Sequence, residues 1–202
     1  MKVINKLRLG LLPIIIITFL SNLFYINVFA AGSDNEYRNV LDEINNEYGL
    51  EIGYGSVDIN EVSLEEYKAY VEQVAIRQKE LKELIDNRSS FDSDERINQF
   101  RGTRTVSKAV WGVYDDSFKI QATFDVNGMI ISNPRDFSIQ RTLLAIFRQE
   151  YFDPNQGSPT SAIIDSGRTL AVTYVGTYHA HSSGGSVVLT NITMYTEFYY
   201  TD

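Results

Sequence analysis

Two histidines, His179 and His181, have the spacing of a metal-binding pair. Residues two apart on a β-strand share a face, with Cα atoms roughly 7 Å apart, and two imidazoles at that separation can share one zinc ion. A zinc site needs a third ligand, but the sequence contains no further histidine and no cysteine. The strand expected to pair with the histidines offers Ser186 and Val188 instead of a carboxylate. The pattern therefore favours histidines exposed near a strand end, with metal binding as the alternative, and predicts no cofactor.

The sequence carries none of the local motifs of nucleophilic or nucleotide-dependent catalysis. It has no cysteine nucleophile, no G-x-S-x-G elbow and no P-loop or dinucleotide-binding fingerprint. A glycosidase needs two carboxyl groups brought together in space, which a linear sequence does not reveal. Asp115, Asp116 and Asp125 stand at expected turns, the ordinary place for aspartate. We therefore favour a binding protein over an enzyme, and we assign no catalytic residue.

Tyrosines of the C-terminal half are the candidate binding residues: Tyr174, Tyr178, Tyr195 and Tyr199. Tyrosine supplies a large, rigid and amphipathic contact area, and binding surfaces are enriched in it. Tyrosine is also a good strand former, so the same residues could simply belong to a sheet. Both interpretations stay open, and the first predicts contact with an extracellular protein or polymer.

Residues 1–30 have the three parts of a secretory signal peptide. A basic start precedes an apolar run over 9–20, and Val28-Phe29-Ala30-Ala31 stands behind it. Small residues one and three positions before the cut favour cleavage after Ala30 over cleavage after Ala31. The alternative is an uncleaved membrane anchor. Because no cysteine is present to carry a lipid, we expect a free, secreted chain without membrane attachment after cleavage.

Negative charge is concentrated in the first half of the expected mature chain. Residues 31–100 carry 17 acidic and seven basic side chains, whereas residues 101–202 carry nine and eight. Such an acidic excess repels polyanions, so we expect no nucleic-acid binding. An exported chain without cysteine has no disulfides, and its apolar core must stabilise the fold alone.

Residues 31–87 are predicted to form an acidic helical hairpin. Ser33 and Ser63 each stand three residues before a glutamate, the capping-box pattern that begins a helix. Apolar residues then recur at spacings of three and four over residues 64–85, interrupted by Gln78, as in a heptad seam. The favoured interpretation covers this seam with the shorter helix, and the alternative is a homo-oligomer through 64–85.

Residues 88–104 are polar and aperiodic and are predicted to be a linker, followed by an antiparallel β-domain over 105–202. Alternating apolar residues over 118–126 predict a strand, and Asn127-Gly128 is typical of a hairpin turn. Residues 138–152 suit either a helix or a strand, and their β-formers favour a strand.

The last forty residues predict a second hairpin around Ser182-Ser183-Gly184-Gly185. If this hairpin is regular, paired residues are fixed by the turn, which places Val172 opposite Tyr195 and Tyr178 opposite Leu189. Apolar residues occur on both faces, so we expect the pair to lie inside a sandwich or a curled sheet.

The segment from Ile163 to Val172 (IIDSGRTLAV), with the ending Glu197-Phe198-Tyr199-Tyr200, resembles a family of uncharacterised secreted proteins of Bacillus-type Gram-positive bacteria. The stretches 46–49 and 63–67 are similar to the N-terminal parts of such proteins. The resemblance implies origin and export, and it carries no site residues.

Together these patterns predict an α+β fold, with an N-terminal helical hairpin followed by an antiparallel β-sandwich-like domain. The predicted function is an extracellular binding or interaction module. The alternatives are an extracellular hydrolase acting on wall or matrix polymers and a secreted toxin or antimicrobial factor.

Overall fold

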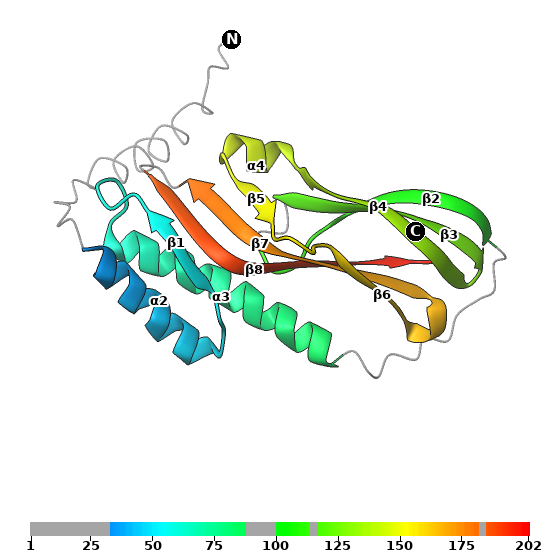
Figure 1. The fold of residues 1–202 in the computed structure, drawn as a ribbon, viewed down its shortest axis with the longest axis horizontal. Helices are drawn as coiled ribbons and strands as arrows, with labels where there is room; N and C mark the ends of the chain where they lie inside the picture. The colour runs from blue at the N-terminus through cyan, green and yellow to red at the C-terminus, as the bar shows by residue number, and fades with distance from the viewer. Residues whose placement is uncertain (1–32, 88–99, 114–116, 182–184) are drawn as a thin grey trace, which may run out of the picture. The chain divides into compact units, whose positions relative to one another are not determined.

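The computed structural model describes residues 33–87, 100–113, 117–181 and 185–202 (Figure 1). The predicted signal peptide, the cleavage positions Ala30 and Ala31, and the first part of the predicted linker lie outside these ranges. Within the described ranges, no helix is both long enough and apolar enough to cross a bilayer. The chain contains both helices and strands, and the strands form antiparallel sheets, which confirms the mixed α+β class. The elements in chain order are α2 (Asp34–Tyr48), β1 (Gly53–Val57), α3 (Leu64–Asp86), β2 (Phe100–Ala109), β3 (Phe118–Gly128), β4 (Ile130–Arg141), α4 (Leu143–Phe147), β5 (Tyr151–Pro154), β6 (Thr160–Ile164), the 3-10 turn η2 (Asp165–Gly167), β7 (Thr169–His181) and β8 (Ser186–Tyr199).

Both predicted capping boxes form. The Ser63 hydroxyl accepts a hydrogen bond from the Glu66 N–H at 3.2 Å, and the Glu66 carboxylate accepts one from the Ser63 N–H at 3.0 Å. The same reciprocal pair, Ser33 with Glu36, begins α2. These local bonds satisfy main-chain donors that a helix start leaves open, so the sequence alone was sufficient to place both N-termini.

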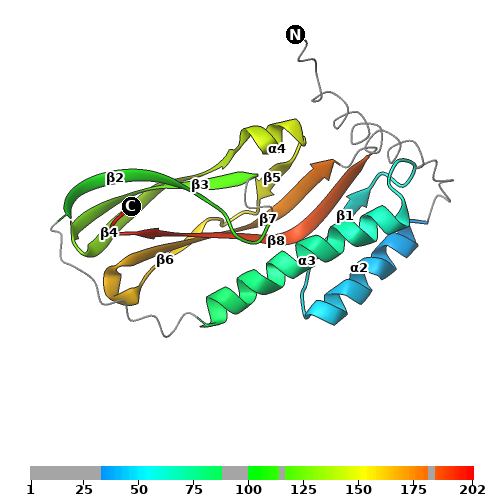
Figure 2. The same cartoon turned by 180° about the vertical axis from the view of Figure 1, so that it is seen from behind.

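A strand lies between the two helices, which the sequence did not predict. β1 pairs antiparallel with β8, with Tyr54 opposite Leu189. Its sequence, GYGSV, has two glycines and no clear alternation, so it lacks the usual strand signal. Residues 31–87 are therefore not purely helical, and β1 brings this segment into the sheet of the C-terminal half (Figures 1 and 2).

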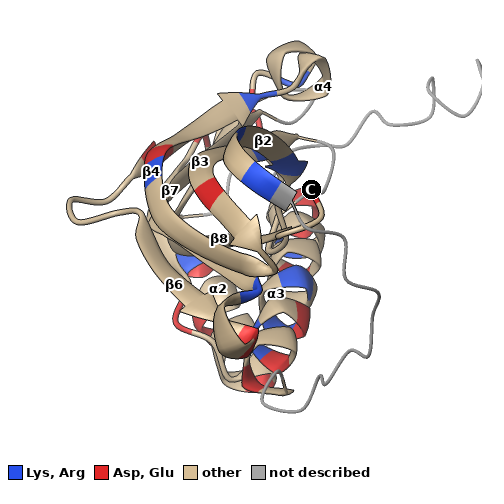
Figure 3. Cartoon of the chain, turned by 90° about the vertical axis from the view of Figure 1, so that its right-hand side faces the viewer, with Lys and Arg blue, Asp and Glu red and all other residues tan. Residues whose placement is uncertain are grey.

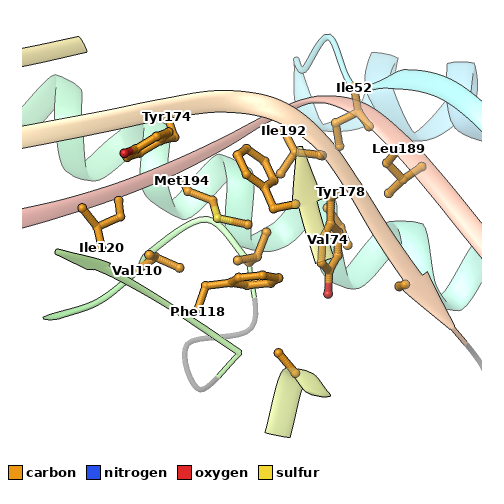
Figure 4. Packing of buried hydrophobic residues seen from close by; sticks show 14 of the residues in the cluster. Ile52, Val74, Val110, Phe118, Ile120, Tyr174, Tyr178, Leu189, Ile192 and Met194 are labelled. Atoms are coloured by element: carbon orange, nitrogen blue, oxygen red, sulfur yellow. The ribbon is translucent and has the colours of Figure 1, made fainter. Parts of the chain in front are cut away.

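Two antiparallel sheets enclose most of the core. One has the order β1-β8-β7-β5, with β6 also on β7, and the other has the order β2-β3-β4. Aromatic pairs join the two sheets, Phe118 with Tyr178 at 6.0 Å and Phe124 with Phe198 at 5.9 Å between ring centroids. Figure 4 shows Val74 of α3 among these core residues.

The heptad seam of α3 is occupied within this chain. Tyr67, Val71, Val74, Gln78 and Leu81 are all buried. The Tyr67 ring packs edge to face on Tyr37 of α2, with 5.2 Å between centroids. These five seam positions are therefore covered within the chain, whereas Ile85, the last one, is 40% exposed. The homo-oligomer, the alternative for residues 64–85, stays a prediction.

Three local predictions in the β-half are corrected. β2 begins at Phe100, so residues 100–104 are strand and not linker. Asn127 pairs with Ile130, so the hairpin turn is centred on Gly128-Met129, one residue later than predicted, with Gly128 at φ 68°. Within residues 138–152, where a strand was favoured, Leu143–Phe147 form the helix α4 between β4 and β5.

The C-terminal hairpin has the predicted register near its turn but not beyond a β-bulge. Tyr178 pairs with Leu189 as predicted, whereas Val172 pairs with Thr196 instead of Tyr195. The extra residue lies at Thr190-Asn191, and Asn191 has φ 58°. A bulge places two residues opposite one and shifts every later pair, which a regular hairpin rule does not include.

Candidate functional site

Three of the four predicted binding tyrosines lie in the interior. Tyr174, Tyr178 and Tyr195 are buried, whereas Tyr199 is 36% exposed. Burial raises the pKa of the Tyr174 hydroxyl. The prediction of a contact surface formed by all four is therefore wrong, because both faces of β7 and β8 are covered along much of their length. Tyr195 and Tyr199 nevertheless belong to a candidate site.

The two histidines lie beside β5 and its preceding turn. The His179 ring stacks on Tyr151 with 3.9 Å between centroids, and its Nε2 lies 3.1 Å from an Asp153 carboxylate oxygen. His181 Nδ1 lies 3.2 Å from the Gln149 carbonyl oxygen. Over the described ranges, no three metal-ligating side chains gather at one point. Asp125, expected in a turn, lies within β3 opposite Ser132.

Trp111 follows β2 and forms an isolated bridge with Tyr195 of β8. The Trp111 N–H donates to the Tyr195 carbonyl at 2.8 Å, and the Tyr195 N–H donates to the Trp111 carbonyl at 3.1 Å. The indole also stacks on the Tyr195 ring, with centroids 5.8 Å apart and planes 26° apart. Trp111 is 37% exposed, so the ring surface turned away from Tyr195 remains open.

A buried carboxyl group holds the tyrosines beneath this indole. Tyr195, Glu197 and Tyr199 alternate along β8 and so share one face. Glu197 is buried and accepts hydrogen bonds from the Tyr195 hydroxyl and, at 2.8 Å, from the Tyr199 hydroxyl. The two rings are thereby fixed in orientation at the base of the site.

The open side of Trp111 faces a pocket of about 670 Å³ between the C-terminal end of α3 and the β6–β7 turn. A smaller pocket of about 180 Å³ shares Trp111, Leu84 and Glu80 with it. Apolar and aromatic side chains line the larger pocket together with three carboxylates and one guanidinium. The apolar and aromatic members are Leu84, Trp111, Tyr199 and Tyr200, the charged ones are Glu80, Glu83, Asp165 and Arg168, and Asn87 and Thr169 complete the lining.

Contacts from α3 hold the Trp111 segment at the edge of β8. The Gln78 Nε2 donates to the Gly112 carbonyl and, at 2.8 Å, to the Thr193 carbonyl. Gly112 has φ 103° and packs so closely that a Cβ there would lie 2.2 Å from the Thr193 oxygen. A glycine is required where the backbone turns and approaches this closely.

The pocket combines a flat aromatic surface with hydrogen-bonding groups at its rim. Pockets of this kind bind a ligand by apolar contact and fix its orientation by a few polar groups. Three carboxylates against one guanidinium disfavour an anionic ligand. Carboxylates also accept hydrogen bonds from hydroxyl and amino groups, and the guanidinium of Arg168 donates them.

The sequence analysis found Tyr195 and Tyr199 but missed the rest of this site. Trp111 is the only tryptophan in the chain, and its position just after a strand was an available signal. The helix residues Glu80, Glu83 and Leu84 had no such signal, because they meet Trp111 only in the folded chain.

Comparisons with known proteins give no family for the chain. No family model matches the sequence. No curated protein matches it either. Among solved structures, it is similar to hypothetical protein lmo2686 from Listeria monocytogenes EGD-e, with 14% sequence identity and a TM-score of 0.26. That similarity covers 53% of this chain and 79% of the other.

Proposed function

We propose that the chain is an extracellular binding protein whose pocket beside Trp111 takes a saccharide segment without net negative charge. The open, Tyr195-backed indole at the pocket carries the proposal. The C–H face of a sugar ring is apolar and packs on an aromatic ring, while its hydroxyl groups need hydrogen-bonding partners. Leu84 adds apolar surface, and the carboxylates and Arg168 supply the polar contacts.

We further propose that the chain is secreted and meets this ligand outside the cell. The signal-peptide pattern of residues 1–30 supports secretion, with the mature chain beginning at Ala31, and the resemblance supports a Gram-positive source. The two sheets, joined by aromatic pairs, are proposed to form a sandwich-like domain with α2 and α3 packed at one end. N-terminal sequencing of the protein from culture medium tests the export step, and any start other than residue 31 or 32 contradicts it.

Fluorescence provides the direct test of binding, because Trp111 is the only tryptophan and lies in the pocket. Neutral oligosaccharides and amino-sugar oligosaccharides are titrated separately, and we expect a saturable change in tryptophan emission with at least one of them. Calorimetry then compares the wild type with Trp111→Ala, for which we expect about tenfold or greater loss of affinity. Phe147→Ala removes an exposed aromatic residue on α4, outside the pocket, and should leave binding unchanged.

The same titrations separate this proposal from its alternatives. Release of shorter products during incubation identifies the hydrolase, which the carboxylates of Glu80, Glu83 and Asp165 could support. Saturation by a quaternary ammonium compound instead of a saccharide identifies an aromatic cage for cations. If no saccharide changes the emission or produces heat, the saccharide proposal is wrong.

A further inference from the structure

The short helix α4 presents a contiguous apolar surface to solvent. Leu143 is 74% exposed and Phe147 81%, and Leu144 and Ile146 are also exposed, whereas Ala145 is buried. Single exposed apolar residues are ordinary on a protein surface, but a contiguous apolar patch marks an interaction site. Four large side chains on a five-residue helix form such a patch, which we call the α4 tip.

The α4 tip is anchored to the fold and not frayed from it. The Thr142 hydroxyl accepts a hydrogen bond from the Ala145 N–H at 3.3 Å and caps the helix. The Thr142 N–H donates to the Ser117 carbonyl at 3.0 Å, and the Glu150 N–H donates to the Ala145 carbonyl at 2.8 Å. These bonds at both ends hold the apolar side chains outward in a fixed arrangement.

The tip projects from the side of the molecule opposite the acidic helices. In Figures 1 and 3, α4 stands above the sheets and α2 and α3 lie below them. Figure 3 shows most of the acidic residues on the two helices, among basic ones, and basic residues together with an acidic one next to α4. Arg141 and Arg148, the residues that flank the tip in the sequence, are both exposed. Their guanidinium groups are held against the protein, where Arg141 Nη2 donates to the Ala145 carbonyl at 3.5 Å and Arg148 Nη1 donates to the Ser117 hydroxyl at 3.4 Å. The tip is therefore an apolar projection with cationic groups at its base.

We propose that the α4 tip docks this protein on an anionic phospholipid bilayer. A convex apolar projection needs no matching groove in a fluid bilayer, where the side chains of Leu143 and Phe147 would enter the region between headgroups and acyl chains. The guanidinium groups of Arg141 and Arg148 then lie at the depth of the phosphates, while their aliphatic stems contact the apolar layer. Their charge complements the negative surface of anionic lipid.

This docking is peripheral and reversible. Even a single myristoyl chain gives only marginal, reversible binding, with a partition constant of about 10⁴ M⁻¹. We expect membrane binding of similar strength from four partly inserted side chains. The inference is independent of the saccharide pocket, which is lined by Trp111 after β2 and by residues at the C-terminal ends of α3 and β8 and at the β6–β7 turn. It departs from the sequence-based expectation of a chain without membrane contact after cleavage.

Co-sedimentation with vesicles tests the proposal. The protein spanning residues 31–202 contains every described element and the whole described core. It is mixed with vesicles of phosphatidylcholine alone, or of phosphatidylcholine with phosphatidylglycerol. We expect binding to the mixed vesicles that weakens with added salt. Leu143→Ser combined with Phe147→Ser should lower the partition constant about tenfold or more. The matched control, Ile130→Ser with Ile163→Ser, removes two exposed apolar residues elsewhere and should change little.

A second variant and a second measurement separate a lipid surface from other partners. Arg141→Gln with Arg148→Gln should reduce binding to the mixed vesicles several-fold and leave binding to neutral vesicles unchanged. Phe147→Trp in a Trp111→Phe background should show blue-shifted emission on vesicles and quenching by brominated lipid. Absent binding, or binding that the tip variant retains, overturns the proposal. So does a self-association in sedimentation equilibrium that the tip variant abolishes, because the tip would then bind a second copy.

Discussion

The side-chain amide of Gln78 takes the place of a neighbouring strand at the open edge of β8. Its Oε1 accepts from the Thr193 N–H at 3.1 Å, and its Nε2 donates to the Thr193 carbonyl at 2.8 Å. Upstream on β8, β1 pairs as far as Thr190, and downstream Trp111 pairs with Tyr195. The one polar residue of the α3 seam therefore connects the helix to the sheet.

Gln78→Leu should destabilise the protein by about 2 kcal/mol or more, because it leaves the buried Gly112 carbonyl and the partly buried N–H and carbonyl groups of Thr193 without this partner. Urea unfolding measures the change in free energy. Gln73→Leu replaces an exposed glutamine of the same helix and should cost clearly less than Gln78→Leu, because its side chain is not buried. Equal effects for the two variants would mean that Gln78 contributes only helix propensity.

Gly112→Ala should be among the most disruptive single changes in the chain. Gly112 has φ 103°, and its added Cβ would lie 2.2 Å from the Thr193 oxygen. We expect a loss of about 3 kcal/mol or more, combining backbone strain with overpacking, and a red shift of Trp111 emission as its bridge to Tyr195 opens. Gly157 also has positive φ, at 91°, but with nothing within 4 Å of an added Cβ. Gly157→Ala therefore measures the cost of backbone strain alone. If both variants lose a similar free energy of unfolding, the close approach of Gly112 to Thr193 is not the cause.

Glu197→Leu should weaken both stability and pocket binding, because the hydroxyls of Tyr195 and Tyr199 lose a shared acceptor. The expected cost in stability is about 2–4 kcal/mol, and Glu197→Gln, which keeps one acceptor oxygen, should cost less. Tyr195→Phe combined with Glu197→Leu completes a double-mutant cycle. Additive free energies in that cycle would show that the two side chains are not coupled.

Local signals in the sequence were sufficient for the features that local bonds create. The caps at Ser33 and Ser63 and the register next to the C-terminal turn depend on residues close together in the chain. Two elements did not have a sufficient local signal: β1 was missed, and the segment of α4 was left open between helix and strand, with strand favoured. β1 becomes a strand because β8 offers it an edge, and α4 forms between strands, where its composition did not distinguish helix from strand.

The candidate site was only partly predictable for the same reason. A tyrosine on a two-sided strand pair is exposed only where no element covers that face, and sequence alternation does not record which face is covered. Tyr174 and Tyr178 meet the core, whereas Tyr199 lies at an open pocket. In the sequence, Glu197 has no feature that distinguishes it from an exposed glutamate. In the structure it is buried and accepts a hydrogen bond from Tyr195.

Acid should remove a stabilising contribution of Asp125 between about pH 4 and pH 2. Hydrogen bonds from Arg135 first, and then from Thr103 and Asn133, lower the pKa of its carboxyl to about 2. Because the folded-state pKa lies below the unfolded-state value of about 3.9, the contribution is complete above that value and is lost as the pH falls through the folded-state pKa. Carboxyl NMR titration should find a midpoint near 2, and a midpoint near 3.9 contradicts the assignment. Asp125→Asn should remove this part of the pH dependence of stability.

Deleting Asn191 should be tolerated, although it shortens a central strand. Leu189 pairs with Tyr178 and Ile192 with Gly176, so β8 has one residue more than β7 between these pairs. Removing the bulge residue leaves both pairs and the inward side chains of Leu189 and Ile192 in place, and it also removes a positive φ of 58°. We expect a cooperative urea transition with a loss of about 1–3 kcal/mol.

Deleting Thr196 is the matched control, because it lies in a regular part of the same ladder opposite Val172. Its loss shifts the following residues by one and turns Glu197 toward the position of buried Thr196, while Phe198 turns away from Phe124. We expect this variant to lose its cooperative transition. If instead the Asn191 deletion unfolds the chain and the Thr196 deletion does not, the bulge is not where the register changes. The difference between the two deletions therefore tests whether the β-bulge at Thr190-Asn191 is where the observed hairpin departs from a regular one.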